Sequence, residues 1–338
     1  KILFGKNLSS MLEAGLPLSR AIEVIGRQSR NKKYKFVMNN LNDSIKSGDT
    51  LSGAMAKFPS VFSKLFISMV RAGEESGDLV GALGVVSSQM EKTNELKKKI
   101  RGAMIYPGVI ITAMTGIGIF MLMFIVPTLT KTFVELNVEL PKSTQFIINV
   151  SDAFRENTFT LLSLVVLVIV LLIAGFKTSR GKRIMDWVFL HMPLVSGLVK
   201  ETNSARTART LSSLIKSGVP YISAVDITQE VIQNSYYKAV LKKAGKNVEL
   251  GLPVAKVFEE NQKLYPVFVS EMIAVGEETG ELGQMLMKVA TYYENEVEAK
   301  TKNMSTIVEP FLMIIVGAAV GFFALSMISP MYSLVENI

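Results

Sequence analysis

Residues 73–79 read Gly73-Glu74-Glu75-Ser76-Gly77-Asp78-Leu79, and residues 276–282 read Gly276-Glu277-Glu278-Thr279-Gly280-Glu281-Leu282. Five of the seven positions are identical, and the other two are conservative exchanges. The copies are 203 residues apart, and the same offset aligns residues 8–21 with residues 211–224. Because this register persists over most of the chain, the sequence predicts a tandem duplication rather than two chance motifs.

The duplication extends beyond the polar segments, because Pro107 and Pro310 also align in apolar surroundings. Each repeat therefore consists of a polar part followed by an apolar run. One irregularity interrupts the register: Phe58-Pro59 and Tyr265-Pro266 lie four positions out of alignment. We expect loops of different length in the two repeats at this point.

Three long stretches contain no Asp, Glu, Lys or Arg: residues 102–130, 157–176 and 310–335. The chain is 49% hydrophobic, and its mean hydropathy of +0.34 exceeds that of a usual soluble domain. A helix of about 20 apolar residues spans the hydrocarbon layer of a bilayer, which is about 30 Å thick. We therefore expect transmembrane helices at residues 103–130, 157–176 and 307–335.

The flanking charges orient these helices. Lys and Arg gather at 97–101, 177–183 and 300–302, whereas residues 131–156 hold three basic and four acidic side chains. Positive charge next to a span stays in the cytoplasm. The amino terminus, a first bundle (1–102) and a second bundle (177–306) are thus expected in the cytoplasm, and residues 131–156 form an extracytoplasmic loop. The middle span, which has no counterpart in the repeat, returns the chain to the cytoplasmic side.

The polar part of each repeat has a helical pattern. Apolar residues recur at three-to-four spacing in residues 8–25 and 211–227, and no alternating strand pattern is present. Gly15-Leu16-Pro17 and Gly218-Val219-Pro220 are typical of a helix end followed by a helix start. The predicted fold class is an all-α membrane protein with two tandem cytoplasmic helical-bundle domains and three transmembrane helices.

Composition limits the chemistry. The chain has no cysteine and a single histidine, His191, so disulfides, thiolate metal sites and histidine-based catalysis are not expected. No phosphate-binding Gly-x-x-x-x-Gly-Lys-Ser/Thr loop is present. The net charge of +8 is spread over segments beside a membrane, which favours anionic lipid rather than nucleic acid as the partner. We expect no enzyme activity, no cofactor and no metal.

The repeated acidic element is expected to be a turn between two helices. Gly73 and Gly276 would end one helix, while Ser76 and Thr279 would cap the next, with an acidic residue in its first turn. Capping does not account for the paired glutamates, which leaves partner docking or cation binding open; adjacent glutamates in a turn diverge into water and lack the pocket that catalysis needs. The candidate partner-binding residues are Gly73, Glu74, Glu75, Ser76, Gly77, Leu79, Gly276, Glu277, Glu278, Thr279, Gly280 and Leu282.

Further candidates lie in the expected spans. Gly317 and Gly321 form a small-xxx-small face, which allows close helix approach either within the chain or to a second subunit or a substrate helix. Pro107 and Pro310 are expected near span starts, where a missing backbone N–H is least damaging. All four are predicted helix-packing residues.

The motifs together resemble the type II secretion system F family, the platform proteins of type IV pilus and type II secretion machines. The resemblance covers nearly the whole chain. Many members have a further amino-terminal segment, and this chain begins at Lys1. The motifs that carry the resemblance are Leu12-Glu13-Ala14-Gly15-Leu16-Pro17-Leu18, residues 69–77, Tyr106-Pro107, Pro193-Leu194-Val195, residues 208–211, residues 217–220 and residues 272–280.

The resemblance implies a non-enzymatic platform in the bacterial inner membrane. Its implied partners are a cytoplasmic hexameric assembly ATPase, pilin or pseudopilin subunits, other inner-membrane assembly proteins, membrane lipid and further copies of itself. A type IV pilus machine is the first interpretation, and the equivalent platform of a type II secretion system is the alternative. A transporter is disfavoured because the expected spans contain few polar residues, and a scaffold without motor contact remains open.

Overall fold

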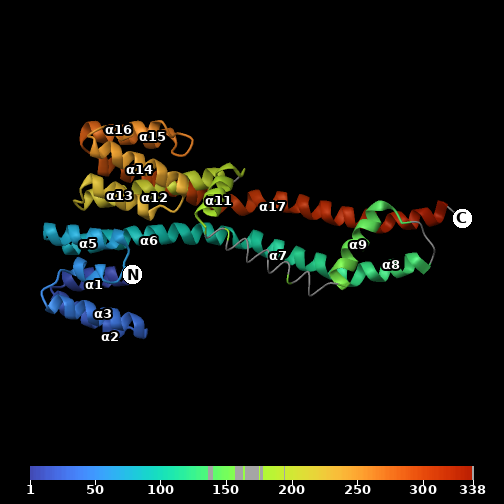
Figure 1. Ribbon diagram of the computed structural model, residues 1–338, viewed down its shortest axis with the longest axis horizontal. Helices are drawn as coiled ribbons and strands as arrows, with labels where there is room; N and C mark the ends of the chain where they lie inside the picture. Colours follow the sequence, from blue (N-terminus) through green and yellow to red (C-terminus); the bar gives the residue numbers. More distant parts are fainter. Residues whose placement is uncertain (136–139, 157–162, 164–174, 176–177, 194, 337–338) are drawn as a thin grey trace. The chain divides into compact units, whose positions relative to one another are not determined.

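The computed structural model describes residues 1–135, 140–156, 163, 175, 178–193 and 195–336. Every regular element in these residues is a helix (Figure 1), which confirms the all-α prediction. The helices form two compact units. The first comprises Lys1–Lys98 and Arg183–Glu298, and the second comprises Lys99–Lys182 and Ala299–Ile338.

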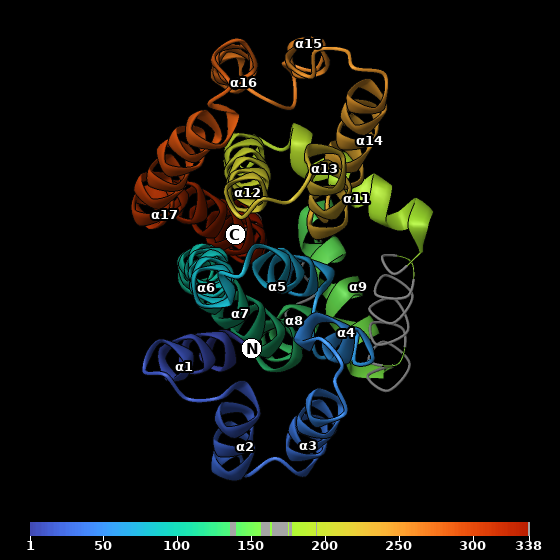
Figure 2. The same cartoon turned by 90° about the vertical axis from the view of Figure 1, so that its left-hand side faces the viewer.

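The first unit holds the polar part of both copies of the repeat. Helices α2 and α13, α3 and α14, α5 and α16, and α6 and α17 each begin 203 residues apart, which confirms the tandem duplication. Within each copy the second and third helices lie side by side, as Figure 2 shows for α2 with α3 and for α13 with α14. The first copy consists of α1 (Ile2–Glu13), α2 (Leu18–Gln28), α3 (Lys32–Lys46), α4 (Leu51–Ala56), α5 (Lys64–Ser76) and α6 (Leu79–Ala103). The second consists of α12 (Ser196–Lys216), α13 (Tyr221–Val231), α14 (Ser235–Glu249), α15 (Ala255–Glu259), α16 (Val267–Thr279) and α17 (Leu282–Glu336), and α11 (Ser179–His191) precedes it.

The expected difference in loop length between the repeats is wrong. The connections α4–α5 and α15–α16 occupy residues 57–63 and 260–266, which are equally long. The structural counterpart of Tyr265 is Phe62 and not Phe58, because both Phe62 and Tyr265 are buried aromatic residues at the end of the loop. Burial therefore sets the register here, and the prolines merely occupy different places in the loop.

The two Gly-x-Pro signals end helices as predicted. Gly15 and Gly218 have φ angles of 84° and 81°, in the left-handed region that glycine adopts without strain. The backbone N–H of Leu16 donates to Met11 O and that of Val219 donates to Leu214 O, each at 3.0 Å. These bonds satisfy carbonyl groups that the helix end would leave without partners.

One contact in the hydrophobic core is aromatic in the first repeat and polar in the second. In the first repeat Phe4 packs on Phe62 with ring centroids 5.5 Å apart. In the second repeat these positions are Thr207 and Tyr265, whose side-chain oxygens lie 3.0 Å apart in a buried hydrogen bond. Burial raises the pKa of Tyr265 well above its ordinary value, so this hydroxyl stays protonated.

A polar contact joins the repeats inside the first unit. The buried side chain of Gln89 on α6 donates to Thr210 Oγ1 at 3.1 Å and accepts from Ser213 Oγ at 3.3 Å, both on α12. On the surface, Lys64 of α5 forms an ion pair with Glu230 of α13. The two copies thus pack on each other as one body with a shared core.

The second unit contains α7 (Ile105–Phe120), the π-helical turn η1 (Met121–Ile125), α8 (Val126–Glu135), α9 (Lys142–Glu156) and the end of α17. Residues 131–156, expected as a loop, are thus partly helical. α9 is held by two hydrogen bonds of 2.5 Å, from Thr144 Oγ1 to Ser326 O and from Ser151 Oγ to Leu122 O. Thr144, Ile147, Ile148 and Ser151 follow the spacing of one helix face, and Ile147 and Ile148 pack into a small core with α8 and α17.

Two stretches of the described chain are long and apolar enough to cross a membrane: Leu79–Phe133 and Val308–Ile328. Only 6% and 17% of their most apolar windows are buried against protein, so apolar surface is left for lipid to cover. The third expected span, residues 157–176, lies outside the described residues apart from two single positions.

Pro310 lies near the start of the apolar stretch Val308–Ile328, as expected, but no helix begins there, because α17 continues from Leu282 to Glu336. A proline inside a helix removes one hydrogen bond, and a helix with many residues on both sides continues past it. Pro107, in contrast, lies in the first turn of α7, as expected.

Candidate functional site: the two acidic turns

The acidic element forms the same turn in both repeats, four residues later than expected. α5 continues through Gly73 to Ser76 and α16 continues through Gly276 to Thr279, so the prediction that Gly73 and Gly276 end these helices is wrong. The residues after the helices, Gly77 and Gly280, have φ angles of 76° and 74°. These second glycines therefore make the left-handed turn.

Gly73 and Gly276 have a packing role instead. A Cβ atom on Gly73 would lie 2.4 Å from the Cβ of Ala82, and one on Gly276 would lie 2.7 Å from the Cα of Leu282. The following helix crosses so closely that no side chain fits between the two backbones. Leu79 and Leu282 occupy equivalent positions at the start of this helix and pack, partly buried, against the core.

The cap of the second helix also differs from the prediction. Ser76 Oγ and Thr279 Oγ1 donate back into their own helix, to Gly73 O at 3.4 Å and Val275 O at 2.7 Å. Thr279 Oγ1 also accepts the backbone N–H of Glu281, directly before α17, at 3.4 Å, so the prediction holds in part for the second repeat. Asp78 caps α6, since its Oδ1 accepts the backbone N–H of Gly81 at 2.8 Å. Aspartate directly before the helix reaches this N–H more easily than a serine two residues further back.

Glu74 and Glu277 each bind a short helix of their own repeat. Glu74 accepts the backbone N–H groups of Leu51 and Ser52 at 2.5 and 3.1 Å, at the start of α4. Glu277 accepts those of Val254 and Ala255 at 2.8 and 3.1 Å, at the start of α15. A carboxylate at a helix start satisfies N–H groups that lack partners and lies at the positive end of the helix dipole.

The neighbouring glutamates have no such contact among the described residues. Glu75 and Glu278 are exposed at equivalent positions, next to the exposed Gly77 and Gly280. Each turn thus has one glutamate that holds the fold and one that faces solvent. Docking at these turns stays a prediction, and its best-placed residues are Glu75 and Glu278.

Two further contact pairs are repeated, and sequence reasoning missed them. Ser9 Oγ donates to Val80 O, and Ser212 Oγ donates to Gly283 O, so the first helix of each repeat is bonded to the helix after the acidic turn. The second contact is an ion pair: Lys6 with Glu91 in the first repeat and Arg209 with Glu294 in the second. The repeat alignment contained the signal, because equivalent polar residues at both ends of a contact recur 203 residues apart.

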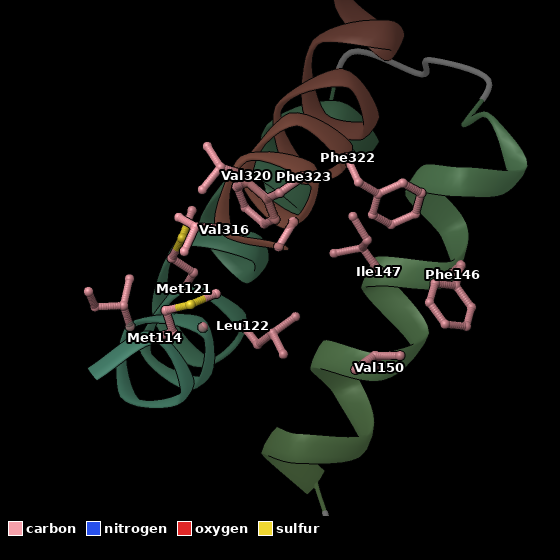
Figure 3. Close-up of a pocket in the computed structure, with 13 residues that line it drawn as sticks. Met114, Met121, Leu122, Phe146, Ile147, Val150, Val316, Val320, Phe322 and Phe323 are labelled. Carbon is pink, nitrogen blue, oxygen red and sulfur yellow. The ribbon is translucent and has the colours of Figure 1, made fainter. Parts of the chain in front are cut away.

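The expected packing residues of the apolar unit have open surroundings. A Cβ atom on Gly317 or Gly321 would meet no described atom within 4 Å. Near them, an apolar cavity of about 460 Å³ is lined by α7 with η1, by α9 and by α17. Figure 3 shows Met121, Ile147 and Phe322, one from each of these segments, directed into this cavity. Contact of Gly317 and Gly321 with another helix stays a prediction.

The family model for type II secretion system (T2SS) protein F matches residues 4–127 and 207–330. The chain belongs to this family. The two matches begin 203 residues apart, which is the offset found in the sequence and in the helices, so each structural repeat corresponds to one copy of the protein F module.

Relatives in this family cover nearly the whole chain. The type IV pilus assembly protein PilC of Thermus thermophilus is 35% identical over 336 residues, which are 99% of this chain and 82% of the relative. PilC of Myxococcus xanthus is 33% identical and covers 98% of this chain and 80% of its own. The type II secretion system protein F of Vibrio cholerae is 30% identical, with shares of 97% and 80%.

Proposed function

We propose that this protein F family member is the inner-membrane platform of a type IV pilus assembly machine. The observation that carries the proposal is similarity over nearly the whole of this chain to proteins named for pilus assembly, at 32–35% identity. The equivalent role in a type II secretion system is the second candidate, because relatives at 30 and 31% identity are named for that system. Deletion of the gene in the source bacterium separates them: loss of surface pili supports the first, and loss of secreted enzymes with pili retained supports the second.

We further propose that both helical lobes of the first unit, Lys1–Lys98 and Arg183–Glu298, face the cytoplasm. The basic clusters beside the apolar stretches support this orientation. The chain has no cysteine, so single cysteines at Lys46 and Lys242, both exposed, can be labelled selectively. A membrane-impermeant maleimide should react with both only after the membrane is opened. Labelling of one site and not the other in intact cells would contradict the topology.

We propose that a cytoplasmic assembly ATPase docks at the exposed side of the acidic turns. Glu75 and Glu278 are two equivalent carboxylates on one body, and neither is used within the described fold. Glu74, which is next to Glu75, and Glu277, which is next to Glu278, each bind their turn to a short helix. Force applied at the turn is therefore transmitted to the rest of that repeat. Movement of the motor would tilt the lobes, and α6 and α17, which run on from the turns, would carry that movement toward the apolar unit.

The docking test uses the glutamates that do not hold the fold. Glu75→Lys with Glu278→Lys should weaken ATPase copurification and filament formation, because repulsion replaces attraction at both lobes. Glu13→Lys with Glu249→Lys is the matched control, since these glutamates are exposed elsewhere on the same two repeats. Equal ATPase binding by both double variants would remove the docking assignment and leave the family role intact.

We also propose that the apolar cavity of the second unit receives the apolar helix of a pilin subunit. No charged side chain is among the residues that line it, so a polar solute has no partner there. A photoreactive residue at Phe322 should crosslink to pilin in cells, and the same residue at the exposed Phe36 of α3 should not. Absence of pilin adducts at Phe322 in cells that assemble pili would refute this contact.

A further inference from the structure

Helix α11 carries an apolar stripe that stays exposed in the part of the chain that the structure describes. Ile184, Trp187, Val188 and His191 follow the spacing of one helix face, and all four are exposed. Ile184 is 63% exposed and Trp187 is 51% exposed, which is unusual for such large apolar side chains.

The opposite face of α11 is anchored to the first unit, so the stripe has a fixed direction. Asp186 Oδ2 accepts both the backbone N–H and the Oγ–H of Ser235 at 2.7 Å, and Leu190 is buried. The Arg183 guanidinium lies 5.5 Å from the centre of the Tyr236 ring. α11 therefore lies beside the start of α14 (Figure 2), while Trp187 and His191 of the stripe border a hollow shared with Tyr236 and residues 259–264.

The direction of Trp187 is also set within the helix. Its ring stacks on that of His191 with centroids 4.4 Å apart, and His191 Nδ1 lies 2.8 Å from Trp187 O. An exposed tryptophan on an apolar stripe has its greatest affinity for the interface between lipid headgroups and acyl chains, where the ring is in an apolar medium and its N–H reaches polar groups.

Charge identifies the surface that covers this stripe. Arg180, Lys182 and Arg183 directly precede it, and the single acidic residue of the helix, Asp186, is occupied on the other face. These basic residues follow an uncharged run of 20 residues, and Ile184 lies only eight residues beyond the end of that run in the sequence, which favours a position near a bilayer surface. The hollow that Trp187 and His191 border does not offer the same attraction to anionic headgroups, because Lys200 and Lys263 share it with Glu259 and Glu260.

We propose that α11 is an in-plane membrane helix whose Ile184, Trp187 and Val188 insert into the headgroup boundary of an anionic bilayer. The inference rests on the proposed membrane role of the chain and assigns it a surface contact beyond its spanning segments. The basic residues bind anionic headgroups, and the stripe enters the upper acyl region. Since α11 is bonded to α14, this contact sets the height and tilt of the second lobe above the membrane.

The chain supplies its own probe, because Trp187 is its single tryptophan. The full chain is reconstituted in nanodiscs of phosphatidylcholine and phosphatidylglycerol, with or without bromine on the upper acyl chains of the phosphatidylcholine. Tryptophan emission should fall by about half or more with the brominated lipid, because quenching requires near contact with bromine. Acrylamide in the aqueous phase should quench the emission only weakly.

Substitutions in the stripe test whether it inserts into the bilayer or merely lies near it. Ile184→Ser with Val188→Ser should reduce quenching by bromine about twofold or more, since the stripe loses most of its apolar area. Ile222→Ser on α13 is the matched control, an exposed isoleucine of the same unit, and should change nothing. Replacing phosphatidylglycerol by phosphatidylcholine should also weaken the quenching.

Three results would overturn the proposal. Strong quenching by acrylamide with none by bromine would place the stripe in water. Protection from both quenchers would mean that protein covers it, either a partner or a second copy. Equal quenching by bromine in wild type and in the Ile184 and Val188 double variant would remove the stripe as the cause. Failure of the chain to remain in nanodiscs would instead contradict the membrane role itself, so the two failures are distinguishable.

Discussion

Removal of the Glu277 carboxylate is expected to release α15 locally. Glu277 accepts two backbone N–H groups at 2.8 and 3.1 Å, and these donors have no partner within their own short helix. A hydrogen bond to a charged acceptor contributes about 1.5–3 kcal/mol, and loss of a helix cap costs about 0.5–2 kcal/mol. Because the site is only half-buried, water replaces part of the interaction, and we expect Glu277→Ala to lower the local opening free energy by about 2 kcal/mol.

Hydrogen–deuterium exchange measures this loss where it occurs. A decrease of about 2 kcal/mol speeds amide exchange in residues 255–259 about 30-fold, since each 1.4 kcal/mol is a factor of ten. The first repeat is an internal control: Glu74→Ala should affect α4 and leave α15 unchanged. Glu278→Ala, the exposed neighbour, should change neither helix. Unchanged exchange of α15 in Glu277→Ala, or an equal effect of Glu278→Ala, would refute the capping role.

Three other substitutions have expected outcomes in thermal or denaturant unfolding of the purified protein. Gly276→Ala should destabilise the fold by about 1–3 kcal/mol because the added methyl clashes with the next helix, whereas Gly84→Ala, in helix α6 with ordinary space around it, should be neutral or stabilising. Arg209→Ala should cost about 3 kcal/mol, since its ion pair with Glu294 is only 14–18% exposed; Lys6→Ala breaks the equivalent exposed pair and should cost at most about 1 kcal/mol. Gln89→Leu should cost about 1–3 kcal/mol because it leaves two buried hydroxyls of α12 without their partner.

Each of these expectations has a contrary result. Tolerance of alanine at residue 276 would mean that the helices separate readily at the turn. Equal losses at Arg209 and Lys6 would show that burial does not distinguish the two ion pairs. If Gln89→Leu left the midpoint of thermal or denaturant unfolding unchanged, the contact between the repeats would be too weak for them to unfold together.

The sequence predicted the turns correctly in kind but not in detail. The Gly-x-Pro ends at Gly15 and Gly218 follow from local backbone preferences, and these were predicted to the residue. At the acidic turn two glycines compete, and the sequence offers no local reason to prefer Gly77 over Gly73. Packing makes the choice: the helix continues until the chain clears the close crossing with Ala82.

For the paired glutamates, too, the sequence predicted the location of the turn but not the role of each residue. Sequence pattern treated Glu74 and Glu75 alike, because both are acidic residues next to a turn. Their roles diverge only once α4 is placed, since its first N–H groups come within reach of Glu74 and not of its neighbour. A contact between residues 23 positions apart depends on the path of the chain between them and cannot be predicted from helical spacing alone.

By itself the sequence determined the helical class, the duplication with its 203-residue offset and the apolar stretches that favour a membrane, because periodicity, repetition and hydropathy are properties of neighbouring residues. The tertiary structure decided which glycine turns the chain, which glutamate holds a helix and which face of α11 remains bare. Those outcomes depend on contacts between distant segments, and such contacts exist only after the helices have packed.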